Sequence, residues 1–185
     1  MDKKEYRKGV LADIASLSKD YLEESNAGIR EHFLAMPEYK KASVIFAYIS
    51  EGREPDTVGI IQNALADGKT VALPVSLAGG VMVPRVIYSL DELVPGRFNI
   101  PAPPESAPAV EEESIDLIIV PAVTFNGNGF RLGRGGGYYD RFLSRSGAVS
   151  VGLGRDRLIR DDVPLEPHDQ GVDCLVTETG VKRFV

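Results

Sequence analysis

The stretch "IDLIIVPAVTF", residues 115–125, restricts the fold of this chain more than any other segment. It is an almost continuous apolar run rich in β-branched residues, which is typical of a buried strand. Strands that are buried on both faces belong to sheets covered by helices on either side. The run therefore predicts a strand inside an α/β domain.

Strand and helix patterns alternate along the sequence. Short runs rich in β-branched and aromatic residues predict strands, and apolar residues at helical spacing predict helices. This alternation implies an α/β domain with a largely parallel sheet covered on both faces. We expect helices over Asp2 to about Ser18, about Ser25 to Met36, 56–69 and 138–146, and strands over 43–50, 70–76, 81–87, 115–125, 148–154 and 174–177.

Individual residues mark the ends of several of these elements. Asp2 and Asp56 can cap the helices that follow them, and Pro37 ends the second helix because its ring disfavours helical conformation in the residue before it. Pro84 cannot donate to a ladder, so 81–87 should be an edge strand or an interrupted one. The stretch 101–114, rich in proline and acidic residues, predicts a solvated loop.

The composition limits the class of protein. A chain of 185 residues with 43% hydrophobic content fits one domain, residues 1–185, with a proper core. The net charge of −6 argues against non-specific binding of nucleic acid, which needs a broad positive potential. We therefore expect no nucleic-acid partner, and any basic surface should be local.

Cys174 is the only cysteine, so no internal disulfide can form and the chain suits a reducing compartment. Its place in the strand-like run "CLVT" favours a core position over a nucleophilic role. The N-terminus has no apolar signal segment, and no apolar run is long enough to cross a bilayer. We interpret the protein as a cytoplasmic monomer with no membrane partner.

A glycine-rich stretch, "RLGRGGGYYDRFL" at 131–143, follows the strongest strand and precedes a helix. In an open α/β sheet, ligands bind beyond the carboxyl ends of strands, where loop amides and a helix N-terminus offer unpaired N–H groups. Glycine lets the backbone approach an anion and can adopt the positive φ angles of an amide nest. A flexible surface loop is the alternative, but Arg131, Arg134 and Arg141 concentrate positive charge there and favour a phosphate site.

The common phosphate and dinucleotide motifs do not match this stretch. A Walker A loop ends in Gly-Lys-Ser/Thr, whereas Gly137 is followed by Tyr138, and Tyr138 also occupies the third glycine of G-x-G-x-x-G. At least one of Tyr138 and Tyr139 should be a core residue. Asp140 is either a partner of the helix dipole or, beside a phosphate loop, a ligand of Mg²⁺.

The first helix carries a second indication of an anion. Lys3 and Arg7 fall near the middle of the apolar stripe that Val10, Leu11 and Ile14 form on a helical wheel. Such cations either extend past the core to solvent or point toward an anion at its margin. Fraying of the helix terminus is the simpler explanation of where these two cations fall. A nucleotide phosphate beside the helix would instead favour the anion-binding explanation.

The segment "VPAVTFNGNGFRLGRGGGYYDRFL" closely resembles the signature of the 5-formyltetrahydrofolate cyclo-ligase family, also called 5,10-methenyltetrahydrofolate synthetases. The resemblance extends to "KKEYR", "SEGREPDT", "LVPGRFNIPAP" and "PHDQGVD", in that order, and covers nearly all of the chain. Asn126 departs from it by standing where relatives often carry Asp. The "VPR" at 83–85 also departs from the family's aromatic pattern, so no pterin-stacking residue is assigned.

The resemblance implies a three-layer α/β/α sandwich and an enzyme that converts 5-formyltetrahydrofolate into 5,10-methenyltetrahydrofolate with ATP and Mg²⁺, releasing ADP and phosphate. It implies ATP contacts from Lys3, Lys4, Glu5, Tyr6, Arg7, Arg131, Leu132, Gly133, Arg134, Gly135, Gly136, Gly137, Tyr138 and Tyr139. It implies folate contacts from Ile49, Glu54, Arg134, Gly135, Gly136, Gly137 and Tyr138, and magnesium ligation by Asp140 and Asp169.

Phosphoryl transfer needs positioning and charge neutralisation more than an acid or a base. We expect Arg134 to be the catalytic residue that neutralises the moving phosphoryl group, and Glu54 to orient the folate. His168, in a polar turn beside Asp169, is interpreted as structural. The rival hypotheses are a non-catalytic module that binds nucleotide or folate, and a nicotinamide-dependent oxidoreductase, against which the failed dinucleotide motif counts.

Overall fold

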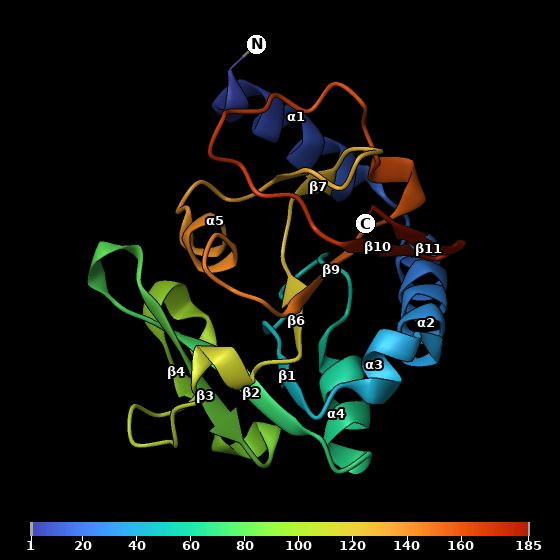
Figure 1. Ribbon diagram of the computed structural model, residues 1–185. Helices are drawn as coiled ribbons and strands as arrows, with labels where there is room; N and C mark the ends of the chain where they lie inside the picture. Colours follow the sequence, from blue (N-terminus) through green and yellow to red (C-terminus); the bar gives the residue numbers. More distant parts are fainter. Residues whose placement is uncertain (1, 185) are drawn as a thin grey trace.

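The computed structural model describes residues 2–184, and Figure 1 shows their arrangement. The α-helices are α1 (Lys3–Ser16), α2 (Lys19–Ala35), α3 (Pro37–Lys41), α4 (Val58–Ala66) and α5 (Tyr138–Leu143). The strands are β1 (Val44–Phe46), β2 (Thr70–Ser76), β3 (Met82–Ile87), β4 (Val94–Pro95), β5 (Pro101–Ala102), β6 (Leu117–Val120), β7 (Thr124–Phe125), β8 (Arg131–Leu132), β9 (Val149–Leu153), β10 (Cys174–Thr177) and β11 (Gly180–Arg183).

A seven-stranded sheet in the order β11-β10-β9-β6-β1-β2-β3 forms the centre of the fold. The five strands from β10 to β2 are mutually parallel, and β3 and β11 add antiparallel edges. Successive side chains of β6 point to opposite faces, so Leu117 and Ile119 enter one hydrophobic cluster and Ile118 and Val120 the other.

Helices cover both faces of this sheet. In Figure 1, α2, α3 and α4 lie together on one side and α5 lies on the other. Ile29 and Phe33 of α2 pack into the first cluster, whereas Phe142 of α5 packs into the second against Phe46 of β1. The predicted three-layer α/β/α architecture with a largely parallel sheet is therefore confirmed.

The strand order places a crevice between β1 and β6. The connection from β1 to β2 runs through α4 on one face, and the connection from β6 to β9 runs through α5 on the other. Because the two connections leave in opposite directions, a crevice opens beyond the carboxyl ends of these neighbouring strands. Ligands of open α/β sheets bind at such positions.

Helix α1 agrees with the prediction, and α2 is longer than predicted. The Asp2 side chain accepts from the amide of Glu5, which caps α1 as expected. Helix α2 begins at Lys19 rather than near Ser25, because the side chain of Ser18 accepts from the amide of Tyr21 and caps it.

Helix α4 covers part of the segment predicted for it. Its N-cap is Thr57 rather than the predicted Asp56, and the carboxylate of Asp56, one residue earlier, accepts from the amides of Val58 and Gly59. Beyond its C-terminus Gly68 has a φ of 73°, as a residue that ends a helix should.

The strand predictions differ from the structure mainly in their ends. The run 115–125 is divided at Pro121, after which the chain leaves the sheet and forms the β7–β8 hairpin. The run 43–50 is a strand only over Val44–Phe46. The edge position of β3 is confirmed, whereas β11 was not predicted.

The segment 101–114 differs from the predicted solvated loop. Part of it lies along the outer edge of β3, where the carbonyl of Pro108 accepts from Val86 and the amide of Val110 donates to Pro84. This cover satisfies backbone groups of an edge strand that would otherwise be free to pair with another chain.

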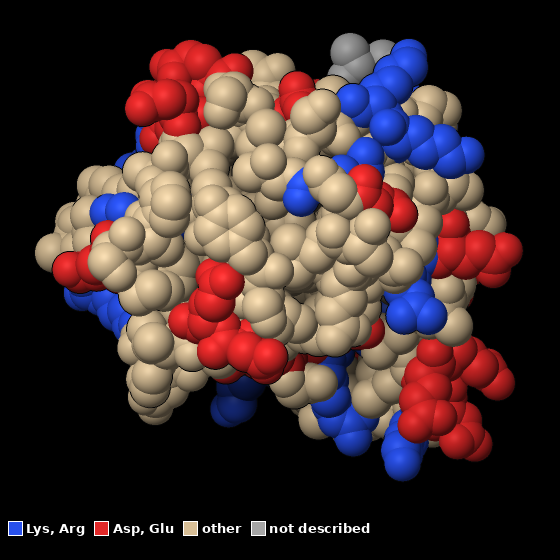
Figure 2. Space-filling model, turned by 90° about the horizontal axis from the view of Figure 1, so that it is seen from below, with Lys and Arg blue, Asp and Glu red and all other residues tan. Residues whose placement is uncertain are grey.

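The structure bears on the expectations for the cysteine, the surface charge and membrane-spanning segments. Cys174 is 3% exposed in the core, and burial raises the pKa of its thiol to about 11, which agrees with a packing role. On the face shown in Figure 2, Lys and Arg side chains are interspersed with Asp and Glu. Within residues 2–184, no helix combines the length and apolar character needed to cross a membrane.

Gly152 on β9 allows the β7–β8 hairpin to pack on the sheet. A Cβ at this position would lie 2.5 Å from Cε1 of the buried Phe125, which is too close for any real contact. We therefore expect Gly152→Ala to lower the free energy of unfolding by about 1–3 kcal/mol through overpacking. Urea denaturation of the two proteins measures the difference.

Gly147→Ala is the matched control for this substitution, because a Cβ at Gly147 would meet no atom within 4 Å. Its free energy of unfolding should stay within about 0.5 kcal/mol of the wild-type value. Equal stability of Gly152→Ala and Gly147→Ala would show that the hairpin does not depend on this close approach.

Candidate active site

A cleft of about 790 Å³ lies beyond the carboxyl ends of β1 and β6. Segments that follow both strands, the N-terminal part of α1 and the glycine-rich loop all contribute to its walls. It is thus located where the strand order predicts a ligand site. The predicted site residues that line it are Lys3, Lys4, Arg7, Ile49, Glu54, Arg131, Leu132, Gly133, Arg134, Gly135, Gly136, Gly137, Tyr138, Tyr139, Asp140 and Asp169.

Two residues of the predicted nucleotide contacts do not line this cleft. Glu5 is exposed on α1, where its amide is used in the cap. Tyr6 packs in a small cluster with Val10 and Leu132, and its hydroxyl donates to Asp162. Burial, together with this hydrogen bond, raises the pKa of Tyr6 to about 12. Of the five predicted nucleotide contacts on α1, Lys3, Lys4 and Arg7 thus reach the cleft.

The glycine-rich loop adopts conformations that favour glycine. Gly135 and Gly137 have φ angles of 100° and 67°, and Gly137 directly precedes α5. Side chains at these two positions would strain the backbone, so the bare main chain is a requirement of the loop. Because α5 has only six residues, the loop amides matter more here than a helix dipole.

The three arginines of this stretch have different roles. Arg131 is 5% exposed and donates to the Asp140 carboxylate and to the carbonyl of Gln170. Arg141 does not line the cleft, and it braces the loop by donating to the carbonyl of Gly136. Of these three arginines, Arg134 alone extends an exposed guanidinium at the cleft, with 66% of its side chain accessible.

Lys3 and Arg7 both point from α1 toward the loops that form the cleft. Nζ of Lys3 lies 2.6 Å from Asp169 and 2.7 Å from Glu166, and Nε of Arg7 donates to the carbonyl of Gly133 at 2.8 Å. These contacts join the N-terminal turn of α1 to the glycine-rich loop and to the segment of Glu166 and Asp169.

The pKa values of Lys3 and Asp169 move in the directions expected of an ion pair. Burial disfavours the charge on Lys3, but its hydrogen bonds to Asp169 and Glu166 outweigh burial and raise its pKa. Burial would likewise raise the pKa of Asp169, yet the bonds from Lys3 and from the amide of Glu166 lower it. Both groups thus stay charged near neutral pH.

The predicted metal ligands lie on neighbouring segments of the cleft wall, and both are engaged with cations. Asp140 accepts from Arg131 and from the amide of Gln170, and Asp169 accepts from Lys3. In the described part of the chain, the one group of acidic and histidine residues with metal-binding spacing is Glu166, His168 and Asp169, with ligand atoms within 4.8 Å of one another. Hard oxygen ligands of this kind suit Mg²⁺.

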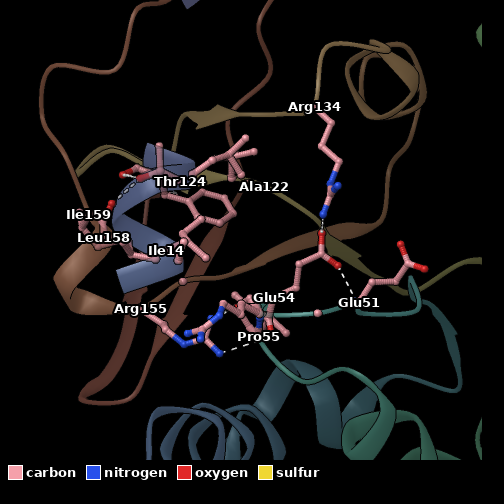
Figure 3. Close-up of a pocket in the computed structure, with 18 residues that line it drawn as sticks. Ile14, Glu51, Glu54, Pro55, Ala122, Thr124, Arg134, Arg155, Leu158 and Ile159 are labelled. Atoms are coloured by element: carbon pink, nitrogen blue, oxygen red, sulfur yellow. Dashed lines mark hydrogen bonds and ion pairs between the residues drawn. The ribbon is translucent and has the colours of Figure 1, made fainter. Parts of the chain in front are cut away.

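Glu54 faces Arg134 across the cleft. Its two carboxylate oxygens accept from Nη2 of Arg134 at 2.7 Å and from the amide of Glu51 at 2.8 Å. Figure 3 shows Arg134 extending from the glycine-rich loop to Glu54, which stands on the loop after β1. Behind this pair lies a second cavity of about 320 Å³, whose apolar lining includes Ile14 and Phe125.

Positive charge is enriched at the cleft. Six of the chain's 21 Lys and Arg residues line the cleft, but only five of its 27 Asp and Glu residues do. The whole chain, in contrast, carries a net charge of −6. This small excess of cations in the cleft favours an anionic ligand. The cations are Lys3, Lys4, Arg7, Arg97, Arg131 and Arg134, and the acids are Glu51, Glu54, Asp140, Glu166 and Asp169.

Some residues of the cleft were not predicted. Arg97 and Phe98 come from the loop between β4 and β5, and Phe98 is 66% exposed with a φ of 59°. An aromatic side chain held in the left-handed region at a cleft is a signal that only the structure provides. Glu166 joins the site through Lys3, from a segment with no regular structure.

The chain is similar in sequence to known proteins. A sequence profile described as the 5-formyltetrahydrofolate cyclo-ligase family matches residues 1–178. The 5-formyltetrahydrofolate cyclo-ligase of Mycolicibacterium smegmatis is 33% identical over 140 residues, which is 72% of each chain.

Two solved structures resemble the fold. The 5,10-methenyltetrahydrofolate synthetase of Aquifex aeolicus superposes with a TM-score of 0.87 at 32% identity, covering 100% of this chain and 93% of that one. The synthetase of Mycoplasma pneumoniae has a TM-score of 0.78 at 20% identity, with 96% and 99% of the chains covered, and supports the fold alone.

Proposed function

Because the chain belongs to the 5-formyltetrahydrofolate cyclo-ligase family, whose members are ligases, we propose that it converts 5-formyltetrahydrofolate into 5,10-methenyltetrahydrofolate. ATP is the proposed co-substrate, with ADP and phosphate as the other products, and Mg²⁺ is the proposed metal. We further propose that residues 1–185 act as one domain, as a monomer in the cytoplasm.

The proposed reaction has two stages. The formyl oxygen attacks the γ-phosphorus of ATP, ADP leaves, and N5 and the formyl carbon become part of a phosphorylated iminium. N10 then attacks that carbon and loses its proton, and the C–O bond breaks to release phosphate and leave the methenyl bridge. The first stage is needed because a formamide oxygen is a poor leaving group until it carries a phosphoryl group.

The glycine-rich loop and α1 are suited to bind the triphosphate. The backbone from Gly133 to Gly137 approaches the cleft with no side chain on four of its five residues. Arg7 is fixed beside this loop through the carbonyl of Gly133, and Lys3 and Lys4 lie on the same helix. These groups supply the positive charge and positioning that phosphoryl transfer requires.

Arg134 is the proposed catalytic residue. Its guanidinium is exposed at the cleft and meets Glu54 from the opposite side, so it lies between the loop for ATP and the loop for the folate. A guanidinium placed there can neutralise the charge that spreads over the transferring phosphoryl oxygens. Glu54 and Ile49 are the proposed contacts to the folate.

Asp140 and Asp169 are the proposed ligands of Mg²⁺, with Glu166 available beside Asp169. The carboxylate oxygens fit a hard cation, which neutralises phosphate charge when bound. Both aspartates line the cleft and already accept from cations, Arg131 and Lys3. Binding of Mg²⁺ would therefore need Lys3 to share or release Asp169.

The observation that carries this proposal is the pair of Arg134 and Glu54 at 2.7 Å, which joins the two predicted substrate loops at one cleft. The test mixes the purified protein with 5-formyltetrahydrofolate, ATP and Mg²⁺ and follows the near-ultraviolet absorption of the methenyl product. Product should form only when all three are present, and NAD should have no effect.

This assay also decides between the proposal and the alternative of a non-catalytic module. Binding of ATP and folate in a calorimeter without any product would support the module. A lack of both binding and product would exclude both functions.

A further inference from the structure

Arg155 is a fully buried cation with no acidic partner in the described part of the chain. It follows β9, its exposed fraction is 2%, and no carboxylate lies within ion-pair distance of it. Its Nη1 donates to the carbonyl of Arg53 at 2.8 Å, and Nη2 lies 3.4 Å from the carbonyl of Glu54. On the other side, Nε donates to Ser25 and Nη2 to Asn26 of α2, at 2.8 and 2.7 Å.

A buried guanidinium held only by neutral acceptors is expensive for the fold. Removal of an ionised group from water is unfavourable even after the protein relaxes, and burial lowers the pKa of Arg155. An apolar residue would fill the same volume more cheaply. The guanidinium is of use because its flat fork can hold several carbonyl oxygens in fixed positions at once.

We propose that Arg155 is a positioning residue for Glu54, and that it does so by fastening the loop 53–56 to α2. Asn26 accepts from Arg155 and also from the amide of Asp56, so the loop is joined to α2 directly at Asp56 and through Arg155 at Arg53 and Glu54. Asn26 and Ser25 lie on a long capped helix that packs on the sheet, which makes α2 a rigid support.

Different residues hold the main chain of the loop 53–56 and the Glu54 side chain. Figure 3 shows Arg155 beneath the loop, while the Glu54 side chain rises on the other side toward Arg134. Arg155 fixes the main chain, and the bonds from Arg134 and from the amide of Glu51 then fix the carboxylate. A shift of about 1 Å in a positioned group can change turnover about 100-fold. The inference rests on the proposed function, since it takes Glu54 to be a folate contact.

The first test does not depend on turnover. In Arg155→Met, amide hydrogen exchange at Glu54 and Asp56 should become about 10-fold faster or more. Exchange at the amides of β6 should change only by as much as the free energy of unfolding changes. Phe33→Leu is the control, because it weakens α2 at a buried position two turns beyond Asn26. Unchanged exchange at Glu54 and Asp56 in Arg155→Met would overturn the proposal.

The second test is kinetic. Arg155→Met should lower kcat/KM for 5-formyltetrahydrofolate about 10- to 100-fold, with KM for ATP within about twofold of wild type. Arg155→Lys keeps the charge, so it should fold well. Because a lysine reaches fewer acceptors, its kcat/KM for the folate should lie between those of wild type and Arg155→Met. Phe33→Leu should leave both KM values unchanged, which separates positioning from general loss of stability.

A double-substitution cycle decides whether Arg155 acts through Glu54. In a Glu54→Ala background, Arg155→Lys should change kcat/KM for the folate by less than about twofold. An undiminished effect in that background would overturn the proposal even if the loop loosens. If the wild-type protein makes no product, the proposed function fails, and amide exchange in Arg155→Met still decides whether the residue holds the loop.

Discussion

Arg134→Ala is expected to lower kcat for the methenyl product by about 10³-fold, the effect of removing one group that stabilises a transition-state charge. The free energy of unfolding should change by less than about 1 kcal/mol, because the side chain of Arg134 is 66% exposed and, without it, the Glu54 carboxylate faces the open cleft and still accepts from the amide of Glu51. Steady-state kinetics at saturating ATP and folate, with urea denaturation of the same samples, measures both quantities.

Arg145→Ala is the matched control. Arg145 is also an ion-paired arginine near α5, bound to Glu112, but it does not line the cleft. It should keep wild-type kcat, and Arg134→Lys should lie between wild type and Arg134→Ala because a lysine keeps the charge without the planar fork. Wild-type kcat in Arg134→Ala would remove Arg134 from the mechanism.

The fold was predictable where local patterns decide it. The apolar run of β6 and the alternation of strands and helices are enough for a parallel sheet with two covered faces. The ends of elements were less predictable, because Pro121 ends β6 within an apolar run and Ser18 caps α2 before its apolar residues begin. Strand β11 pairs with β10 in a local hairpin, but Gly180–Arg183 is a short and mostly polar segment, so no apolar run marks it as a strand.

The sequence was enough to predict that the glycine-rich loop and the cations of α1 line one cleft, because both carry recognisable patterns of residues. The partners of those groups were not predictable, because they come from distant segments. Glu166 meets Lys3 only through the folded chain, and Arg155 meets the loop of Glu54 across about 100 residues. Arg141 was grouped with the phosphate-binding arginines by sequence, but the structure uses it to brace the loop.

Arg131→Met is expected to lower the free energy of unfolding by about 3 kcal/mol. The guanidinium of Arg131 joins Asp140 of α5 to the carbonyl of Gln170, and its side chain is only 3% exposed. Its loss leaves a partly buried carboxylate with no cation, which typically costs about 3–5 kcal/mol, and the 22% exposure of Asp140 places the effect at the lower end. Chemical denaturation followed by circular dichroism measures it.

The double variant Arg131→Met with Asp140→Leu separates the two roles of Asp140. When both charges are removed, no uncompensated carboxylate remains, and apolar side chains of similar size should restore most of the lost stability. The double variant should be inactive, because a leucine cannot hold Mg²⁺. Recovery of stability together with activity would mean that Asp140 serves only to pair with Arg131, and that the metal, if used, is held by Asp169 and its neighbours.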